Sequence, residues 1–301
     1  MWIQGTAGHG VVSKDSLIIT RGTYVVDAAE HGLSGKDDIR IAGGSFTITV
    51  GKDGVHAENK DDASKGFLYI RDGSFVISAD GDALSAGSDV RIDGGDFDLK
   101  TGGGAVSVKV QEEAVLEEAG KRPEGDRKMM EGNEMAPEGG PQRNGGEEPA
   151  FRILEETETT EAGTTEAGST EAETAGEKET GGIEGTEEET VSMKGVKAAG
   201  HLNLNGGTFS IDTADDAVHA GSVTIEGGTF EIMTGDGIDS NGNLEVTGGE
   251  IYVSGSDHGA NEAIDYDGEA NISGGILAAA GTSGMLQTIS SSVQGVICTT
   301  V

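Results

Sequence analysis

Several residue types on which ordinary folds depend are scarce in this sequence. Aromatic residues make up 4% of the 301 positions, too few for the core of a conventional globular domain of this length. Cys298 is the only cysteine, so an internal disulfide is excluded and the redox compartment stays open. The sequence also lacks an uninterrupted apolar run of about 18 residues, so it predicts no membrane-spanning helix.

Positively charged residues are also few. The chain has 20 Lys and Arg against 54 Asp and Glu, which gives a formal net charge of −34. This imbalance argues against a nucleic-acid partner, because the chain would repel its phosphates. The start, MWIQGTAGHG, has neither the basic nor the apolar segment of a signal peptide, so none is predicted in this chain.

Glycine, in contrast, is abundant, with 52 residues, and much of it is regularly spaced. It shows no three-residue period, which excludes a collagen-like triple helix. A phrase of alternating apolar residues around a Gly-Gly pair recurs instead, as in IRIAGGSFTI (39–48) and VTIEGGTFEI (223–232). The second glycine of each copy falls at Gly22, Gly44, Gly73, Gly95, Gly207, Gly228, Gly249 and Gly275. Most steps are 21 or 22 residues long, which indicates an internal structural repeat.

Each repeat predicts one coil of a β-solenoid. Apolar–polar alternation on both sides of the glycine pair is typical of half-buried strands, and glycine permits the bend between them. Two such strands and a third short strand make one coil, which buries its apolar face only by stacking on neighbouring coils. The predicted fold class is therefore all-β, a parallel β-helix with coils of 21–22 residues. The residues expected to stack inside it are Tyr24, Phe46, Phe75, Phe97, Phe209, Phe230, Ile251 and Leu277.

A low-complexity segment interrupts the repeats. Residues 111–190 contain 24 Asp and Glu, 7 Lys and Arg, and all the prolines of the chain. This composition offers too little apolar surface to offset the entropy cost of ordering, so a disordered Glu/Thr/Gly-rich insert is predicted. Residues 1–110 and 191–301 are then two parts of one β-helix domain, whose C-terminal cap is expected to be missing.

Alignment of the third strand of each coil gathers acidic residues into two columns. The first column is His9, His31, Asp53, Asp82, Lys194, Asp216, Asp236 and Glu262. The second column, three residues further on, is Val12, Ser34, His56, Ser85, Lys197, His219, Asp239 and Asp265. Stacked carboxylates about 5 Å apart repel one another strongly unless a cation lies between them.

Oxygen-rich columns without cysteine point to Ca2+ as the cofactor. The predicted ligands are Asp215, Asp216, Asp236, Asp239, Glu262 and Asp265 in the densest cluster, and Asp53, Asp80 and Asp82 in a second one. Zinc is disfavoured at the densest cluster because His219 is the only nitrogen donor near it. His9 and His31 are interpreted as stacked corner residues rather than ligands. The alternative interpretation of the aspartates is that they cap turns, since Asp-Gly is a strong turn signal.

Several phrases of the sequence resemble one protein family. They are GHGVVSKDSLIIT, KDGVHAENKDDASKGFLYIRDGSFVI, MKGVKAAGHLNLNGGTF, DDAVHAGSVTIEGGTF and EAIDYDGEANISGGILAAAGTSGM. In combination they are similar to bacterial carbohydrate-binding domain-containing proteins. The resemblance implies a right-handed parallel β-helix like that of pectate lyases and several bound calcium ions. It also implies an extracellular or cell-surface location and binding of plant cell-wall polygalacturonate and cellulose.

The predicted partner is an acidic polysaccharide, because calcium can bridge carboxylates of the protein to those of a polyuronate. Lys194, Lys197 and His219 are the predicted substrate-binding residues, and no catalytic residue is assigned. One alternative is a calcium-dependent pectate lyase in which Lys194 or Lys197 removes a proton from the sugar. A second alternative is a structural surface protein or adhesin in which calcium only stiffens the solenoid.

Overall fold

The computed structural model describes residues 1–105, 192–256, 262–282 and 287–299. These residues belong to one compact unit of the chain. Residues 106–191 fall outside the described ones, and so does the insert predicted at 111–190. The domain boundaries at 110 and 191 therefore stay a prediction. Within the described residues, no helix has the length and hydropathy needed to cross a lipid bilayer.

The elements of this unit are short strands that pair only in parallel, and they form three faces of a solenoid of about nine turns. The short-strand face consists of β2 (Val11–Ser13), β5 (Leu33–Gly35), β8 (Val55–Ala57), β11 (Leu84–Ala86), the start of β14 (Val196–Leu204), the middle of β15 (Thr208–Ile225), the end of β16 (Thr229–Ser240) and β19 (Ile264–Tyr266).

The second face follows each short strand along the chain. It consists of β3 (Ser16–Ile19), β6 (Asp38–Ile41), β9 (Phe67–Ile70), β12 (Val90–Ile92), the ends of β14 and β15, β17 (Leu244–Val246), β20 (Ala270–Ile272) and β22 (Ser291–Ser292).

The third face follows the glycine pair. It consists of β1 (Trp2–Gly5), β4 (Thr23–Ala28), β7 (Ser45–Val50), β10 (Ser74–Ala79), β13 (Asp96–Thr101), the starts of β15 and β16, β18 (Glu250–Ser254) and β21 (Ile276–Ala280).

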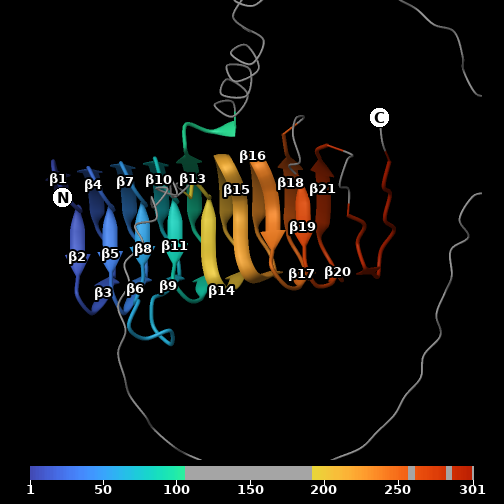
Figure 1. Cartoon of the computed structure of the whole chain (residues 1–301), viewed down its shortest axis with the longest axis horizontal. Helices are drawn as coiled ribbons and strands as arrows, with labels where there is room; N and C mark the ends of the chain where they lie inside the picture. The colour runs from blue at the N-terminus through green and yellow to red at the C-terminus, as the bar shows by residue number, and fades with distance from the viewer. Residues whose placement is uncertain (106–191, 257–261, 283–286, 300–301) are drawn as a thin grey trace, which may run out of the picture. The chain divides into compact units, whose positions relative to one another are not determined.

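The coils stack in chain order, from the blue N-terminal strands to the red C-terminal strands in Figure 1. The predicted repeat length is confirmed, because Tyr24 pairs with Phe46 and Phe209 with Phe230. β13 pairs directly with β15, which lies beyond residues 106–191. Strands from both sides of that segment therefore form consecutive rungs of one solenoid.

The third face supplies the ring ladder of the core. Its strands alternate exposed and buried residues, as in the six residues of β7, β10 and β13. The predicted rings stack on one another with centroids 4.5–5.1 Å apart and planes 3–7° from parallel. Phe46, Phe75, Phe209 and Phe230 are each 1% exposed. The ladder is therefore core and presents no aromatic platform to a ligand.

The second glycine of each pair makes the bend that leads into the third face. Gly44, for example, has φ +136°, a conformation that side chains with a Cβ rarely adopt. A Cβ at Gly44 would also lie 2.9 Å from the carbonyl oxygen of Gly22 in the coil before it. The repeated glycine therefore satisfies both a backbone conformation and a close approach between coils. The predicted fold, an all-β parallel solenoid, is confirmed.

Candidate functional site

The short-strand face carries both predicted columns, and its hydrogen bonds confirm their alignment. In the first column, the Gly237 N–H donates to the carbonyl of Glu262 over 2.7 Å, which places Glu262 beside the preceding Asp236. In the second column, His219 is the direct register partner of Asp239. Side chains of the same column therefore come from adjacent coils, roughly 4.8 Å apart.

Part of the densest predicted cluster is already neutralised by cationic side chains. Asp216, His219 and Asp239 bring donor atoms within 4.8 Å of one another, close enough for one ion. His219 Nδ1 lies 3.0 Å from Asp216 Oδ2 and 2.7 Å from Asp239 Oδ2. Lys194 Nζ contacts Asp216 Oδ2 and lies 3.1 Å from Asp215 Oδ2.

The protonation of these groups follows from the contacts. Hydrogen bonds to Asp216 and Asp239 outweigh burial and raise the pKa of His219 to about 9. Burial opposes the charge of Lys194, but its contacts with Asp216 and Asp215 raise its pKa overall. Burial also opposes ionisation of Asp215, yet Lys194 holds its pKa below the usual value. At neutral pH an imidazolium and an ammonium therefore offset most, but not all, of the charge of the three carboxylates.

The other carboxylates of this cluster are Asp236, Glu262 and Asp265, and they have no such balance. Asp236 Oδ1 accepts the backbone N–H groups of Glu262 at 2.8 Å and Gly237 at 3.0 Å. Asp265 Oδ1 accepts a hydrogen bond of 2.5 Å from Gln287 Nε2. Within the described ranges, no Lys, Arg or His side chain forms an ion pair with any of the three carboxylates.

Among these three carboxylates, the lack of a neutralising partner is clearest at Glu262. The residue is only 6% exposed, and its Oε2 has no hydrogen-bond partner in the described part of the chain. Burial and the nearby charges of Asp265 and Asp236 raise the pKa of Glu262. Burial also raises the pKa of Asp236, and so do Asp216 and Asp239. The three carboxylates supply oxygen donors only, the donor set that Ca2+ prefers, but they are not among the groups of described residues whose donor atoms all lie within 4.8 Å of one another.

The second predicted cluster is divided between different neighbours. Asp82 is 2% exposed, and its Oδ1 accepts a 2.7 Å hydrogen bond from Ser192 Oγ, while Lys197 Nζ lies 3.5 Å from its Oδ2. Asp53 meets Asp82 through the backbone, since Asp53 Oδ1 accepts the Asp82 N–H over 2.9 Å. Asp80 is exposed to solvent.

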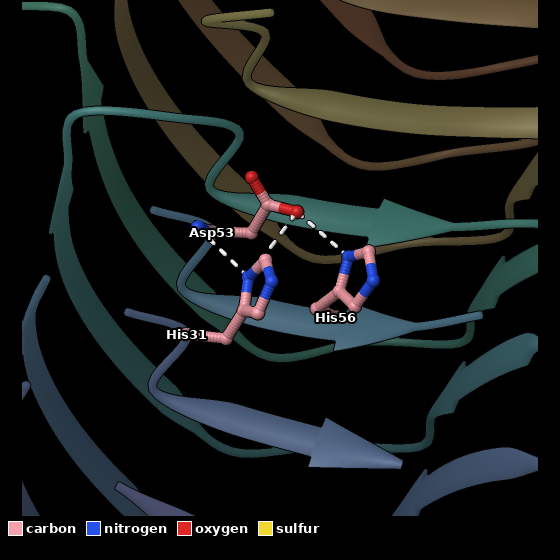
Figure 2. A group of neighbouring side chains, drawn as sticks. All are labelled: His31, Asp53 and His56. Carbon is pink, nitrogen blue, oxygen red and sulfur yellow. Dashed lines mark hydrogen bonds and ion pairs between the residues drawn. The ribbon is translucent and has the colours of Figure 1, made fainter. Parts of the chain in front are cut away.

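Asp53 instead faces two histidines, as Figure 2 shows. Its Oδ2 lies 2.7 Å from His56 Nδ1 and 3.5 Å from His31 Nδ1. The rings of His31 and His56 stack with centroids 4.1 Å apart, and His9 stacks on the far side of His31 at 5.1 Å. The predicted stack of His9 and His31 is thus confirmed, but it continues to His56. The grouping with Asp53 was missed, although the two columns already placed His31 and His56 next to Asp53.

An open groove of about 670 Å3 lies against these groups. Its charged and polar lining includes Lys52, His56, Glu58, Ser85, Ser192 and Lys197. Of the predicted substrate-binding residues, Lys197 therefore lines a groove, with 34% of its side chain exposed. Lys194 is only 14% exposed and is engaged by Asp215 and Asp216.

Fold and site together define a class of protein, a parallel β-solenoid with acidic and histidine clusters along one face. The chain belongs to the family of carbohydrate-binding domain-containing proteins, whose family model matches residues 1–237. No curated protein and no solved structure gave a significant match. Ile264–Tyr266 lies beyond the matched residues and continues the same register, so it extends the same face.

Proposed function

We propose that this chain is a non-catalytic binding module for acidic plant cell-wall polysaccharide, above all polygalacturonate and secondarily cellulose. Calcium bound by Asp236, Glu262 and Asp265 mediates the contact with the uronate groups. The family supports carbohydrate as the ligand class. The observation that carries the proposal is the buried Oε2 of Glu262, which has no hydrogen-bond partner among the described residues and lies near the charges of Asp236 and Asp265.

Calcium suits this group better than the neighbouring one. Asp216 and Asp239 already bind His219 and Lys194, which a metal ion would have to displace. At Glu262 no internal cation competes within the described residues, and burial makes an uncompensated carboxylate costly. A calcium ion takes six to eight oxygen ligands, so these carboxylates leave positions for sugar oxygens.

The remaining contacts fit a glycan that runs along the solenoid. Lys197, His219, Asp239 and Asp265 are successive register partners on the short-strand face. At roughly 4.8 Å per coil, Lys197 lies roughly 14 Å from Asp265 along the stack. Lys197 can then pair with one uronate carboxylate while calcium binds another. His219 lies between them, and an extracellular or cell-surface location is part of this proposal.

Binding without catalysis is favoured by the state of Lys194. β-Elimination needs a neutral amine to remove the sugar proton, and the ion pairs of Lys194 raise its pKa instead. The lyase hypothesis would then have to rely on Lys197, which lies beside Asp82 and Ser192.

The test is co-sedimentation of the full chain with insoluble polygalacturonate, in calcium and in chelator, with ultraviolet absorbance followed for unsaturated products. We expect retention only in calcium and no rise in absorbance. Glu262→Gln should lose the retention, whereas Glu245→Gln, at an exposed position of β17, should keep it. Rising absorbance would identify a lyase, and calcium-dependent stabilisation without retention would favour the structural role; either would overturn the proposal.

Lys197 supplies a second, independent readout. Lys197→Gln should weaken retention several-fold while leaving calcium affinity unchanged, because Lys197 is not a ligand of the proposed ion. Lys60→Gln is the matched control, since Lys60 is 80% exposed and pairs only weakly with Glu58 at 3.6 Å. Equal retention of the two variants would remove Lys197 from the binding surface.

A further inference from the structure

We propose that His31, Asp53 and His56 form a binding site for a divalent transition-metal ion, zinc above all. This site is separate from the calcium site proposed at Glu262 and does not depend on it. Its three donors come from two adjacent coils, with His31 just before β5, Asp53 just before β8, and His56 within β8. Figure 2 shows both imidazoles directed at the same carboxylate.

The donor atoms are close to the spacing that a metal ion requires. They all lie within 4.8 Å of one another, with 2.7 Å from His56 Nδ1 to Asp53 Oδ2 and 3.5 Å from His31 Nδ1 to the same oxygen. Zinc bonds of about 2.0–2.2 Å in tetrahedral geometry separate neighbouring ligand atoms by about 3.4 Å. The contact of His56 with Asp53 therefore needs to open by less than about 1 Å, whereas the contact of His31 with Asp53 already has this length.

His56 is the observation that points to a ligand. Its Nδ1 is buried and makes no hydrogen bond in the described part of the chain, although Asp53 Oδ2 lies 2.7 Å away. A nitrogen lone pair and a carboxylate oxygen at that distance repel each other unless a proton or a metal ion lies between them. A protonated His56 satisfies both atoms as an ion pair, and a metal ion between neutral His56 and Asp53 would satisfy them as well.

The second ring nitrogen of His56 also has an acidic neighbour. Nε2 lies 3.5 Å from Glu58 Oε2, and a carboxylate on that side favours a proton on Nε2. With the proton on Nε2, the lone pair of Nδ1 faces Asp53. His31 Nδ1 accepts the backbone N–H of Asp53 over 3.2 Å, and the same nitrogen lies 3.5 Å from Asp53 Oδ2. A metal ion would replace that weak hydrogen bond.

The chemistry of the donors selects the type of ion. Two imidazole nitrogens and one carboxylate suit zinc, copper or nickel, whereas calcium prefers oxygen donors. No Lys or Arg pairs with Asp53 in the described ranges, in contrast to Asp216, which Lys194 contacts.

The site also has room for an exchangeable ligand. It borders the groove of about 670 Å3, so a fourth coordination position opens to solvent. Three protein ligands with one open position characterise zinc sites that exchange water or an added ligand, whereas closed four-ligand sites are structural.

The test is calorimetric titration of the chelator-treated full chain with zinc in excess calcium, so that the calcium site is filled. We expect one zinc ion per chain and at least a tenfold loss of affinity in His31→Gln/His56→Gln. His201→Gln is the matched control, because His201 lies on β14 and contacts Ser222. Asp53→Asn should also weaken zinc while it keeps the hydrogen bond from the Asp82 N–H, so that a loss of folding is distinguished from a loss of charge.

Copper-loaded protein gives a spectroscopic check on the same assignment. Electron paramagnetic resonance should show coupling to two equivalent nitrogen donors in the wild type and to none from this pair in the double variant. Unchanged zinc affinity in a folded double variant would overturn the proposal. Failure of the wild type to bind zinc at micromolar concentration would overturn it as well.

Discussion

The ring of Phe97 stacks on that of Phe209, with centroids 4.5 Å apart and planes 5° from parallel, although residues 98–208 separate them in the sequence. This contact joins the last complete coil before residues 106–191 to the first coil after them. The ladder of rings therefore continues across the point where the sequence repeat is interrupted, and stability at this junction should depend on it.

Removal of one ring from the ladder should be costly. Phe209→Ala should lower the free energy of unfolding by about 3–5 kcal/mol, because it removes apolar burial and leaves a cavity between stacked rings. Phe209→Leu should lower it by less, since most of the volume is retained. Urea denaturation followed by circular dichroism measures both. Tyr252→Ala is the control, because Tyr252 is 43% exposed and should change stability little.

The glycine pair allows a matched test of the bend. Gly44→Ala should destabilise the chain by more than about 1 kcal/mol, because an alanine at φ +136° is strained and its Cβ would approach Gly22 O to 2.9 Å. At Gly43 the nearest atom to an added Cβ is Thr20 O at 3.8 Å, so Gly43→Ala should be nearly neutral. Thermal unfolding compares the two variants, and equal effects would contradict this role of the bend.

The ion pairs of His219 should make stability depend on pH. Its pKa is about 9 in the folded chain and about 6.5 when unfolded. Its contribution is therefore complete below pH 6.5 and is lost as the pH rises through about 9, a change of roughly 3 kcal/mol at most. Urea unfolding of the wild type and His219→Gln between pH 6 and pH 10 should show their difference shrinking as pH rises. A constant difference would mean that His219 is uncharged.

Protons and calcium should compete at Glu262 and Asp236. Both carboxyls have raised pKa values, so their protonation favours the folded state at low pH and this contribution is lost as pH rises through the folded pKa. Calcium should therefore stabilise the chain more at pH 7 than at pH 4.5. With free calcium 100-fold above its Kd, the gain at pH 7 is about 2.7 kcal/mol. Differential scanning calorimetry measures it, and an equal gain at both pH values would remove these carboxyls from the site.

The fold could be predicted from the sequence because one coil repeats. The spacing of Gly22 and Gly44, with alternation around them, determines both the bend and the buried side of each strand. The ladder and the two columns followed from the same register. Both predictions depend on a local sequence pattern that occurs in eight coils. One weak copy of the pattern, such as that at Gly22, therefore did not prevent the alignment of the others.

The site was harder to predict because the strand register does not determine which side chains contact one another. The sequence alignment placed Lys194, Asp216 and Asp236 in the first column, but only the side-chain positions show that Lys194 contacts Asp216. The same holds for His56, which reaches back to Asp53 within its own coil. Which carboxylates stay uncompensated depends on contacts of a few ångströms, and the spacing of residues in the sequence does not contain that information.

The parallel register spaces the side chains of the short-strand face at regular intervals along the solenoid. Each coil adds one side chain per column at a pitch of roughly 4.8 Å, while the apolar alternation that specifies the fold uses other positions. A substitution at one column position alters a single charge and leaves positions in more distant coils unaffected, because coils contact only their neighbours. Substitutions at column positions would therefore change which charged groups of a ligand this face binds, and at what spacing, while the fold of the solenoid is kept.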